Sequence, residues 1–123
     1  MVDLIPYVNS LLESTGAQIE LSYNDVDATL PLIVLTETEN SADVIIDGKD
    51  AFSRISIQLD IYHYNHRQTR ELVNTVNDIM TKAGFRRRLS PPASEDDIVR
   101  ATIVYSCSVD EKSGRIYGGA DSI

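Results

Sequence analysis

The sequence predicts an α+β domain: a mainly antiparallel sheet of four to five strands with two helices packed on one face. The first observation is that the apolar period changes once, from 2 to 3.6, within residues 54–84. The second is another long alternating segment near the end of the chain, from Val99 to Val109. Two half-buried strands and one amphipathic helix already form the two layers of a small core.

A first helix is expected to run from an Asp3 cap to a stop at Gly16, with Pro6 in its first turn, where no intrahelical amide bond is lost. Ile19 to Leu21 is a short candidate strand. Leu30 to Thr36 is a β-prone run whose proline stands at its entry, as expected for a strand. The apolar residues expected on the inner face of the first helix are Leu4, Ile5, Val8, Leu11 and Leu12.

Residues 37–52 allow two interpretations. Val44, Ile45 and Ile46 precede Asp47-Gly48, which suits one half of a hairpin that leads into the next strand. The same residues also suit an arm that becomes ordered only against a partner. We therefore expect a mobile loop at about 37–52.

The next strand and helix are the clearest elements. The strand alternates apolar residues, from Ile55 to Ile61, with polar ones. Asn65 and Gln68 then have the spacing of an N-cap and capping box, and Gly84 stands where a left-handed residue ends a helix. The apolar stripe of this helix comprises Leu72, Val73, Val76, Ile79, Met80 and Ala83.

The last third of the chain returns to strands. Phe85 to Leu89 is a strand, residues 90–97 form a polar, proline-broken loop that we expect to be mobile, and Val99 to Val109 is the second long strand. Residues 110–114 are a turn, Arg115 to Tyr117 a short return strand, and residues 118–123 a flexible tail. The whole chain, 1–123, is expected to form one domain without internal repeats.

Composition suits a globular protein. The chain has 123 residues, of which 42% are hydrophobic and 24% charged, and no apolar run approaches the length needed to cross a bilayer. Its N-terminus lacks the basic flank of a signal peptide, so we expect no export. Cys107 is the only cysteine, which excludes an internal disulfide and favours a reducing compartment.

The net charge of −8 argues against general binding to nucleic acid or anionic membranes. Residues 1–60 hold eleven acidic and two basic side chains, whereas the remainder holds eight acidic and nine basic. Arg86, Arg87 and Arg88 are consecutive. Such a distribution favours head-to-tail association of copies, because opposite potentials meet at a heterologous interface. The alternative is that the acidic surface serves only solubility.

No catalytic grouping stands out, and we expect neither a cofactor nor a metal site. Asp60, His63 and His66 are the nearest approach to a metal or acid–base cluster, but their parity does not require them to face each other. Residues 43–54 fit a calcium loop only in part, because Arg54 takes the place of the bidentate glutamate. Cys107 has the inward parity of its strand, which favours a buried thiol over a nucleophile.

The order of these elements resembles the tail terminator, or tail completion, proteins of long-tailed phages and related prophages, a family of minor tail proteins. The resemblance runs from Tyr7 to Gly118. It is carried by the N-terminal helix, the proline-led strand LPLIV, the tyrosine-rich strand end DIYHYN, the amphipathic helix, the exit GFRRR and the final strand from Arg100 to Cys107. The family has no invariant site that transfers to this chain residue by residue.

The resemblance implies a protein that is monomeric alone and forms a hexameric ring on the growing tail tube. The ring ends tail polymerisation and offers the surface to which a filled head docks. The implied partners are copies of the chain itself, the tail-tube protein and the head–tail connector proteins, and DNA passes through the ring without specific binding. The implied place is the virion tail or neck, after synthesis in the bacterial cytoplasm.

Two other classes stay open. One is a neck or head-closure protein of the same virions. The other is a small cytosolic ligand-binding module or enzyme that uses Asp60, His63 and Tyr64. The residues we expect at subunit or tail-tube contacts are Arg86, Arg87, Arg88, Arg100, Gln58, Asp60, Tyr62 and Tyr64.

Overall fold

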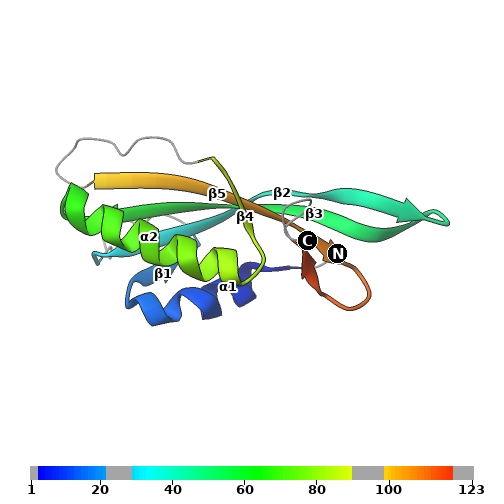
Figure 1. The fold of residues 1–123 in the computed structure, drawn as a ribbon, viewed down its shortest axis with the longest axis horizontal. Coiled ribbons are helices and arrows are strands. Elements are labelled where there is room, and N and C mark those ends of the chain that lie inside the picture. The colour runs from blue at the N-terminus through cyan, green and yellow to red at the C-terminus, as the bar shows by residue number, and fades with distance from the viewer. Residues whose placement is uncertain (1–2, 22–28, 90–98, 118–123) are drawn as a thin grey trace.

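The computed structural model describes residues 3–21, 29–89 and 99–117 (Figure 1). These residues form an α+β fold with a mixed six-stranded sheet and two α-helices on one face, which confirms the predicted fold class with one more strand than expected. The elements, in chain order, are α1 Ile5–Leu12, the 3₁₀ turn η1 Glu13–Thr15, β1 Gln18–Glu20, β2 Leu32–Ile46, β3 Lys49–His63, α2 His66–Lys82, β4 Arg86–Leu89, β5 Val99–Asp110 and β6 Ile116–Tyr117.

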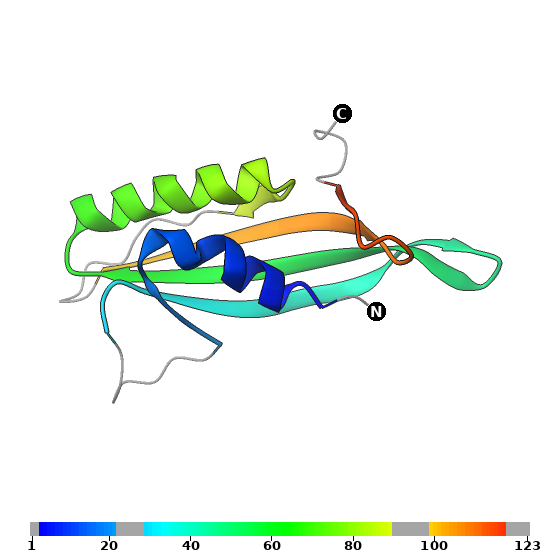
Figure 2. The same cartoon turned by 90° about the horizontal axis from the view of Figure 1, so that it is seen from below.

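The sheet has the strand order β1-β2-β3-β5-β4, and β6 pairs with β5. The pairs β2–β3, β3–β5, β5–β4 and β5–β6 are antiparallel, and only β1–β2 is parallel. Figures 1 and 2 show α1 and α2 on the same side of the sheet, while the joined ends of β2 and β3 extend beyond the helices. Among the described elements, no helix covers the opposite face of the sheet.

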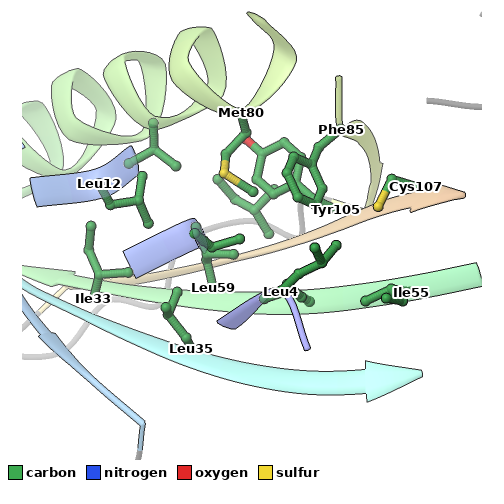
Figure 3. Packing of buried hydrophobic residues seen from close by; sticks show 14 of the residues in the cluster. Leu4, Leu12, Ile33, Leu35, Ile55, Leu59, Met80, Phe85, Tyr105 and Cys107 are labelled. Atoms are coloured by element: carbon green, nitrogen blue, oxygen red, sulfur yellow. The ribbon is translucent and has the colours of Figure 1, made fainter. Parts of the chain in front are cut away.

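The core lies between the helices and the sheet. The odd-numbered residues of β3 and β5, from Ile55 to Ile61 and from Ile103 to Val109, point toward the helices and are buried. Leu12 from α1 and Met80 from α2 pack onto them (Figure 3). The alternation predicted from sequence therefore gives the inner face of the sheet, as expected for strands with one wet face.

Both ends of α2 follow the predicted chemistry. Oδ1 of Asn65 accepts a hydrogen bond of 2.9 Å from the amide of Gln68. At the other end Gly84 has a φ of +100°, and the amides of Gly84 and Phe85 donate to the carbonyls of Thr81 and Met80. These two bonds form the C-terminal motif in which glycine takes the left-handed position.

The first helix is shorter than expected. Asp3 accepts a bond of 3.0 Å from the amide of Ile5, but the N-cap residue is Leu4 and not Asp3 as predicted, and regular α-helix ends at Leu12. The chain then tightens into η1, whose C-cap Gly16 has a φ of +77°. The predicted stop is therefore at the right residue, and the last turn is 3₁₀, as is common at helix ends.

Residues 37–52, expected as a loop, belong to the paired strands β2 and β3 and the turn between them. The reason is the pair Asp47-Gly48, whose φ angles of +53° and +75° suit the tight turn that joins two antiparallel strands. The hairpin alternative is thus the one that the structure has. The expected loop 90–97 and tail 118–123 lie outside the described residues.

In the described part of the chain, neither helix combines the length and the apolar character that crossing a membrane requires.

Candidate functional site

The face of the sheet opposite the helices carries the polar residues of the central strands. Because side chains alternate along a strand, Gln58, Asp60 and Tyr62 of β3 share this open face with Thr102 and Arg100 of β5. Tyr62 pairs directly with Arg100, and Asp60 pairs with Thr102. The structure thus places four of the eight predicted contact residues together on the two central strands of this face: Gln58, Asp60, Tyr62 and Arg100.

Asp60 is held by its neighbours on this open face. The hydroxyl of Thr102 donates a hydrogen bond of 2.6 Å to Oδ1 of Asp60, and the amide of Gln58 donates one of 3.1 Å to Oδ2. Both carboxylate oxygens therefore have a neutral donor. This arrangement fixes the position of the charge at the surface, which suits recognition by another protein more than proton transfer.

A bulge in β2 places a second carboxylate on the open face. The register between β2 and β3 shifts at Thr38, so that Glu37 pairs with Ile57 while Glu39 pairs with Ser56. Without the extra residue Glu37 and Glu39 would point the same way; with it they point to opposite faces. Glu39 accepts hydrogen bonds of 3.2 Å from Ser56 and from Ser41.

The arginines of β4 lie at one edge of the sheet. Arg86 pairs with Ser106 and so belongs to the open face, whereas Arg87 pairs with Tyr105 and belongs to the helix side. Arg88 falls in the register shift between Arg87 and Leu89, so the three arginines do not simply alternate between the two faces of the sheet.

Arg100 does not join the arginines of β4. Arg86 pairs with Ser106, six residues farther along β5 than Arg100. At roughly 3.4 Å per residue the two lie about 20 Å apart along the sheet. The four arginines among the predicted contact residues therefore lie at two separate places on the sheet.

Two glutamates of β2, Glu37 and Glu39, lie in the same cross-strand rows as the arginines of β4. The register links one residue from each of β2, β3, β5 and β4 into a row, and two such rows begin with a glutamate and end with an arginine. The rows are Glu39, Ser56, Ser106, Arg86 and Glu37, Ile57, Tyr105, Arg87. Sequence reasoning identified the acidic half of the chain but missed this alignment, because the bulges that set it leave no clear mark in the apolar pattern.

The histidine cluster considered from sequence does not assemble. His63 has the opposite parity to Asp60 in β3, so the two side chains point to opposite faces of the sheet. Nδ1 of His63 accepts a bond of 2.9 Å from the amide of Tyr64, and His66 is the first residue of α2. Tyr64 itself follows the strand and is 63% exposed. Within the described ranges, no three His, Cys, Asp or Glu residues are placed to hold a metal ion.

Two buried groups have raised pKa values. Burial raises the pKa of the Cys107 thiol to about 12, and Cys107 is 4% exposed, which confirms the predicted buried thiol. Burial also raises the pKa of Tyr105 to about 12, against an opposing effect of nearby Arg87. Both groups stay protonated near neutral pH, which suits a packing role.

A hollow lined by both polar and apolar atoms lies beside the helices. It has a volume of about 390 Å³ and is lined by Leu4, Tyr7, Ala83, Gly114 and Ile116. This lining contains no carboxylate, imidazole or thiol. These five residues therefore offer packing and hydrogen-bonding surface, and they hold none of the usual catalytic side chains.

The far end of the β2–β3 hairpin is apolar and exposed. Ile45 is 62% exposed and Ile46 57% exposed, and they lie beside the turn at Asp47-Gly48. Figure 2 shows this end projecting past the rest of the sheet. Two adjacent exposed isoleucines on a projecting hairpin are a candidate contact point for another protein.

No protein-family model matches the chain, and no curated protein matches it.

Proposed function

We propose that this chain is a structural virion protein of a long-tailed phage, which forms a ring, hexameric in the family it resembles, on the end of the tail tube. In that position it ends tail polymerisation and provides the surface to which the head docks. The support from sequence is the order of elements from Tyr7 to Gly118. The support from structure is the α+β fold itself, with two helices on one face of the sheet.

The observation that carries the proposal is that one face of the sheet and the end of the β2–β3 hairpin are not covered by the described helices. One face of β3 and β5 bears Gln58, Asp60, Tyr62 and Arg100 without a described helix over it. The hairpin of β2 and β3 also extends past the helices (Figure 1). Tyrosine and arginine are enriched at protein interfaces. A small domain with one open sheet face and one projecting arm suits a subunit that touches several neighbours.

The polar groups on the open face also favour contact over chemistry. Asp60, Thr102 and Gln58 satisfy one another on a sheet surface, and Glu39 is satisfied by Ser41 and Ser56. Such bonded groups present a fixed pattern of charge and hydroxyls. A fixed pattern is what a neighbouring subunit or the tail tube needs for recognition.

The direct test is the mass of the protein alone and mixed with the tail-tube protein of the same virus. At micromolar concentration we expect a small species alone, and with tubes a ring of about six copies bound to the tube end. A parallel mixture with portal or adaptor protein is the comparison. Binding to portal or adaptor, with none to tubes, would replace the tail-terminator assignment by that of a neck protein.

A second test uses the virus itself. Removing the gene is expected to give tails longer than normal and without heads, because polymerisation is no longer stopped and the docking surface is missing. Supplying the chain from a plasmid restores normal tails. Tails of normal length in the absence of the gene would contradict the proposal.

The surplus of acidic residues has a place in this proposal. With a net charge of −8, a ring of this chain repels passing DNA instead of holding it. We expect the assembled ring to leave DNA unretarded at low ionic strength. Retardation of DNA by the ring, or an opening lined by basic residues, would remove this part of the proposal.

A further inference from the structure

Among the described strands, the sheet has two edges of opposite charge. On one side, β1 pairs only with Leu32 to Val34 of β2, so in the described chain no strand pairs with the outer edge of β2 beyond Val34. On the other side β4 ends the strand order. The outer part of β2 carries Glu37 and Glu39, and β4 carries its three arginines.

Strand direction makes these edges compatible. The pairs β2–β3, β3–β5 and β5–β4 are all antiparallel, so β4 runs opposite to β2. A second copy placed beside the first, with its β2 next to β4, therefore continues the antiparallel pattern. The helices of both copies then lie on the same side of a continuous sheet.

The register of the strands and the charges at their edges also favour pairing of β4 in one copy with β2 in the next. The two rows that end in Arg86 and Arg87 begin with Glu39 and Glu37, so extending each row into the next copy places an arginine opposite a glutamate. Both members of the Arg86 and Glu39 pair are on the open face, and both members of the Arg87 and Glu37 pair are on the helix side. In the described chain the hydrogen-bond partners of the two glutamates are neutral: Asn40, Ser41 and Ser56.

We propose that copies of this chain associate head to tail through these edges, with β4 of one copy antiparallel to residues 36–39 of β2 in the next. The biological setting of this interface rests on the proposed ring function; the interface itself rests on register and charge. The occupant of each edge is a second copy, because the two rows of one copy match those of the next in both charge and spacing.

The same charges exclude other arrangements. Two β4 edges would bring arginines together, and two β2 edges would bring glutamates together, and like charges directly opposite each other in a sheet are destabilising. Charged edge strands ordinarily prevent aggregation. Here opposite signs on the two edges block symmetric dimers and leave one heterologous pairing, the kind that closes into a ring when its rotation permits.

The first experiment reverses the charge of each edge separately. One variant combines Arg86→Glu with Arg87→Glu, and the other combines Glu37→Arg with Glu39→Arg. Sedimentation velocity at low salt and up to about 1 mM protein detects association even when the dissociation constant is millimolar. We expect wild type to form chains or rings whose mass rises with concentration, and each variant alone to weaken association at least about 10-fold.

The decisive experiment mixes the variant reversed at β4 with the variant reversed at β2. Each variant has like charges on both of its edges, but every contact between the two different variants again joins opposite charges. The equimolar mixture is therefore expected to regain the association of wild type. The matched control combines Arg67→Glu with Arg70→Glu, which makes the same charge change on exposed positions of α2 and is expected to leave association unchanged.

A covalent test does not depend on charge. In one chain Glu39 and Arg86 are separated by three strand spacings, about 14 Å, which is too far for a disulfide. A chain carrying both Glu39→Cys and Arg86→Cys can therefore form this bond only between copies. We expect a ladder of disulfide-linked multimers on oxidation, and none from a chain carrying Glu39→Cys with Arg67→Cys.

The outcomes separate this inference from the proposed function. A wild type that stays monomeric at about 1 mM, a mixture that fails to recover, or an absent ladder would overturn the edge interface. Circular dichroism of each variant identifies any that does not fold, and the cysteine ladder then decides. If rings form on tail tubes without these contacts, the function stands and the edge interface does not; if the ladder forms but tubes are not bound, the reverse holds.

Discussion

The phenolic hydroxyl of Tyr105 donates a hydrogen bond to Oδ1 of Asn77, 2.9 Å away, and so joins the middle of β5 to α2. The ring of Tyr105 is fully buried and packs with Met80 and Phe85 in the core (Figure 3). A buried tyrosine needs such a partner, because its hydroxyl has left water. The bond therefore fixes how the longer helix sits on the sheet whose other face we propose as a contact surface.

Tyr105→Phe is expected to lower the free energy of unfolding by about 1 kcal/mol. The substitution keeps the ring in the core but leaves Oδ1 of Asn77 without its donor, and a net hydrogen bond of this type contributes about that much. Urea denaturation followed by circular dichroism measures the change. Tyr7→Phe, at a residue 42% exposed, is the matched control and should change stability by less than about 0.5 kcal/mol. An equal loss in both variants would show that the bond to Asn77 has no special role.

Stability is expected to fall as pH rises above 9, in part because of Cys107. Burial raises the pKa of this thiol from 9.0 to about 12, so between these values the unfolded chain has lost a proton that the folded chain keeps. Stability from this group is complete below pH 9 and is lost as pH rises toward 12. Urea midpoints at pH 8 and pH 10 for wild type and Cys107→Ala measure it.

The expected result is that wild type loses about 1 kcal/mol more than Cys107→Ala between pH 8 and pH 10. All other ionisable groups are the same in both proteins, so their contributions cancel in the comparison. Tyr105 contributes a similar loss at higher pH, from about 10 upward, since its pKa is also raised to about 12. Parallel pH profiles for the two proteins would mean that the thiol ionises as easily in the folded chain as in the unfolded chain.

The parts of the fold that were predictable are those set by local physics. Alternation from Ile55 to Ile61 gave the inner face of β3, and Asn65 and Gly84 gave the ends of α2. What could not be predicted depends on pairing between distant segments. The bulge at Thr38, for example, exists only relative to β3, and it decides which faces Glu37 and Glu39 occupy.

The features of the candidate site also fall into those that the local sequence predicts and those that depend on the pairing of distant strands. The shared face of Gln58, Asp60 and Tyr62 follows from a period of two and was expected. The separation of Arg100 from Arg86 required the register of β4 against β5, which no local pattern encodes. The hairpin at residues 37–52 was one of two alternatives because the turn Asp47-Gly48 is a strong local signal, while the polar strand before it is not.

Asn65→Ala is expected to destabilise the fold by about 1 kcal/mol. The side chain of Asn65 accepts from the amide of Gln68 and also donates to Oε1 of Gln68, so its removal leaves an amide of the first turn of α2 without a protein partner. Thermal unfolding measures the loss. Asn74→Ala, on the exposed side of the same helix, is the control and should be neutral or slightly stabilising, since alanine favours helix interiors. A similar loss at both positions would point to a general effect of removing asparagine from α2.

The tip of the β2–β3 hairpin is expected to matter for assembly and little for folding. Ile45→Ser combined with Ile46→Ser removes two side chains that are mostly exposed, so the free energy of unfolding should change by less than about 1 kcal/mol. Ile55→Ala, in the buried part of the same hairpin, should cost about 2–5 kcal/mol because it leaves a cavity in the core. Urea denaturation of the three proteins tests this contrast.

If the tip contacts the tail tube or a neighbouring subunit, the folded double variant should cap tubes more weakly than wild type. Exposed apolar side chains on a projecting arm gain free energy when a partner covers them, at about 25 cal/mol for each Å² buried. Tail length in the presence of the variant is the measurement, and Lys49→Ser, at an exposed polar position of β3 next to the same turn, is the control. Normal tail length with the double variant and with the control would assign the arm no part in capping.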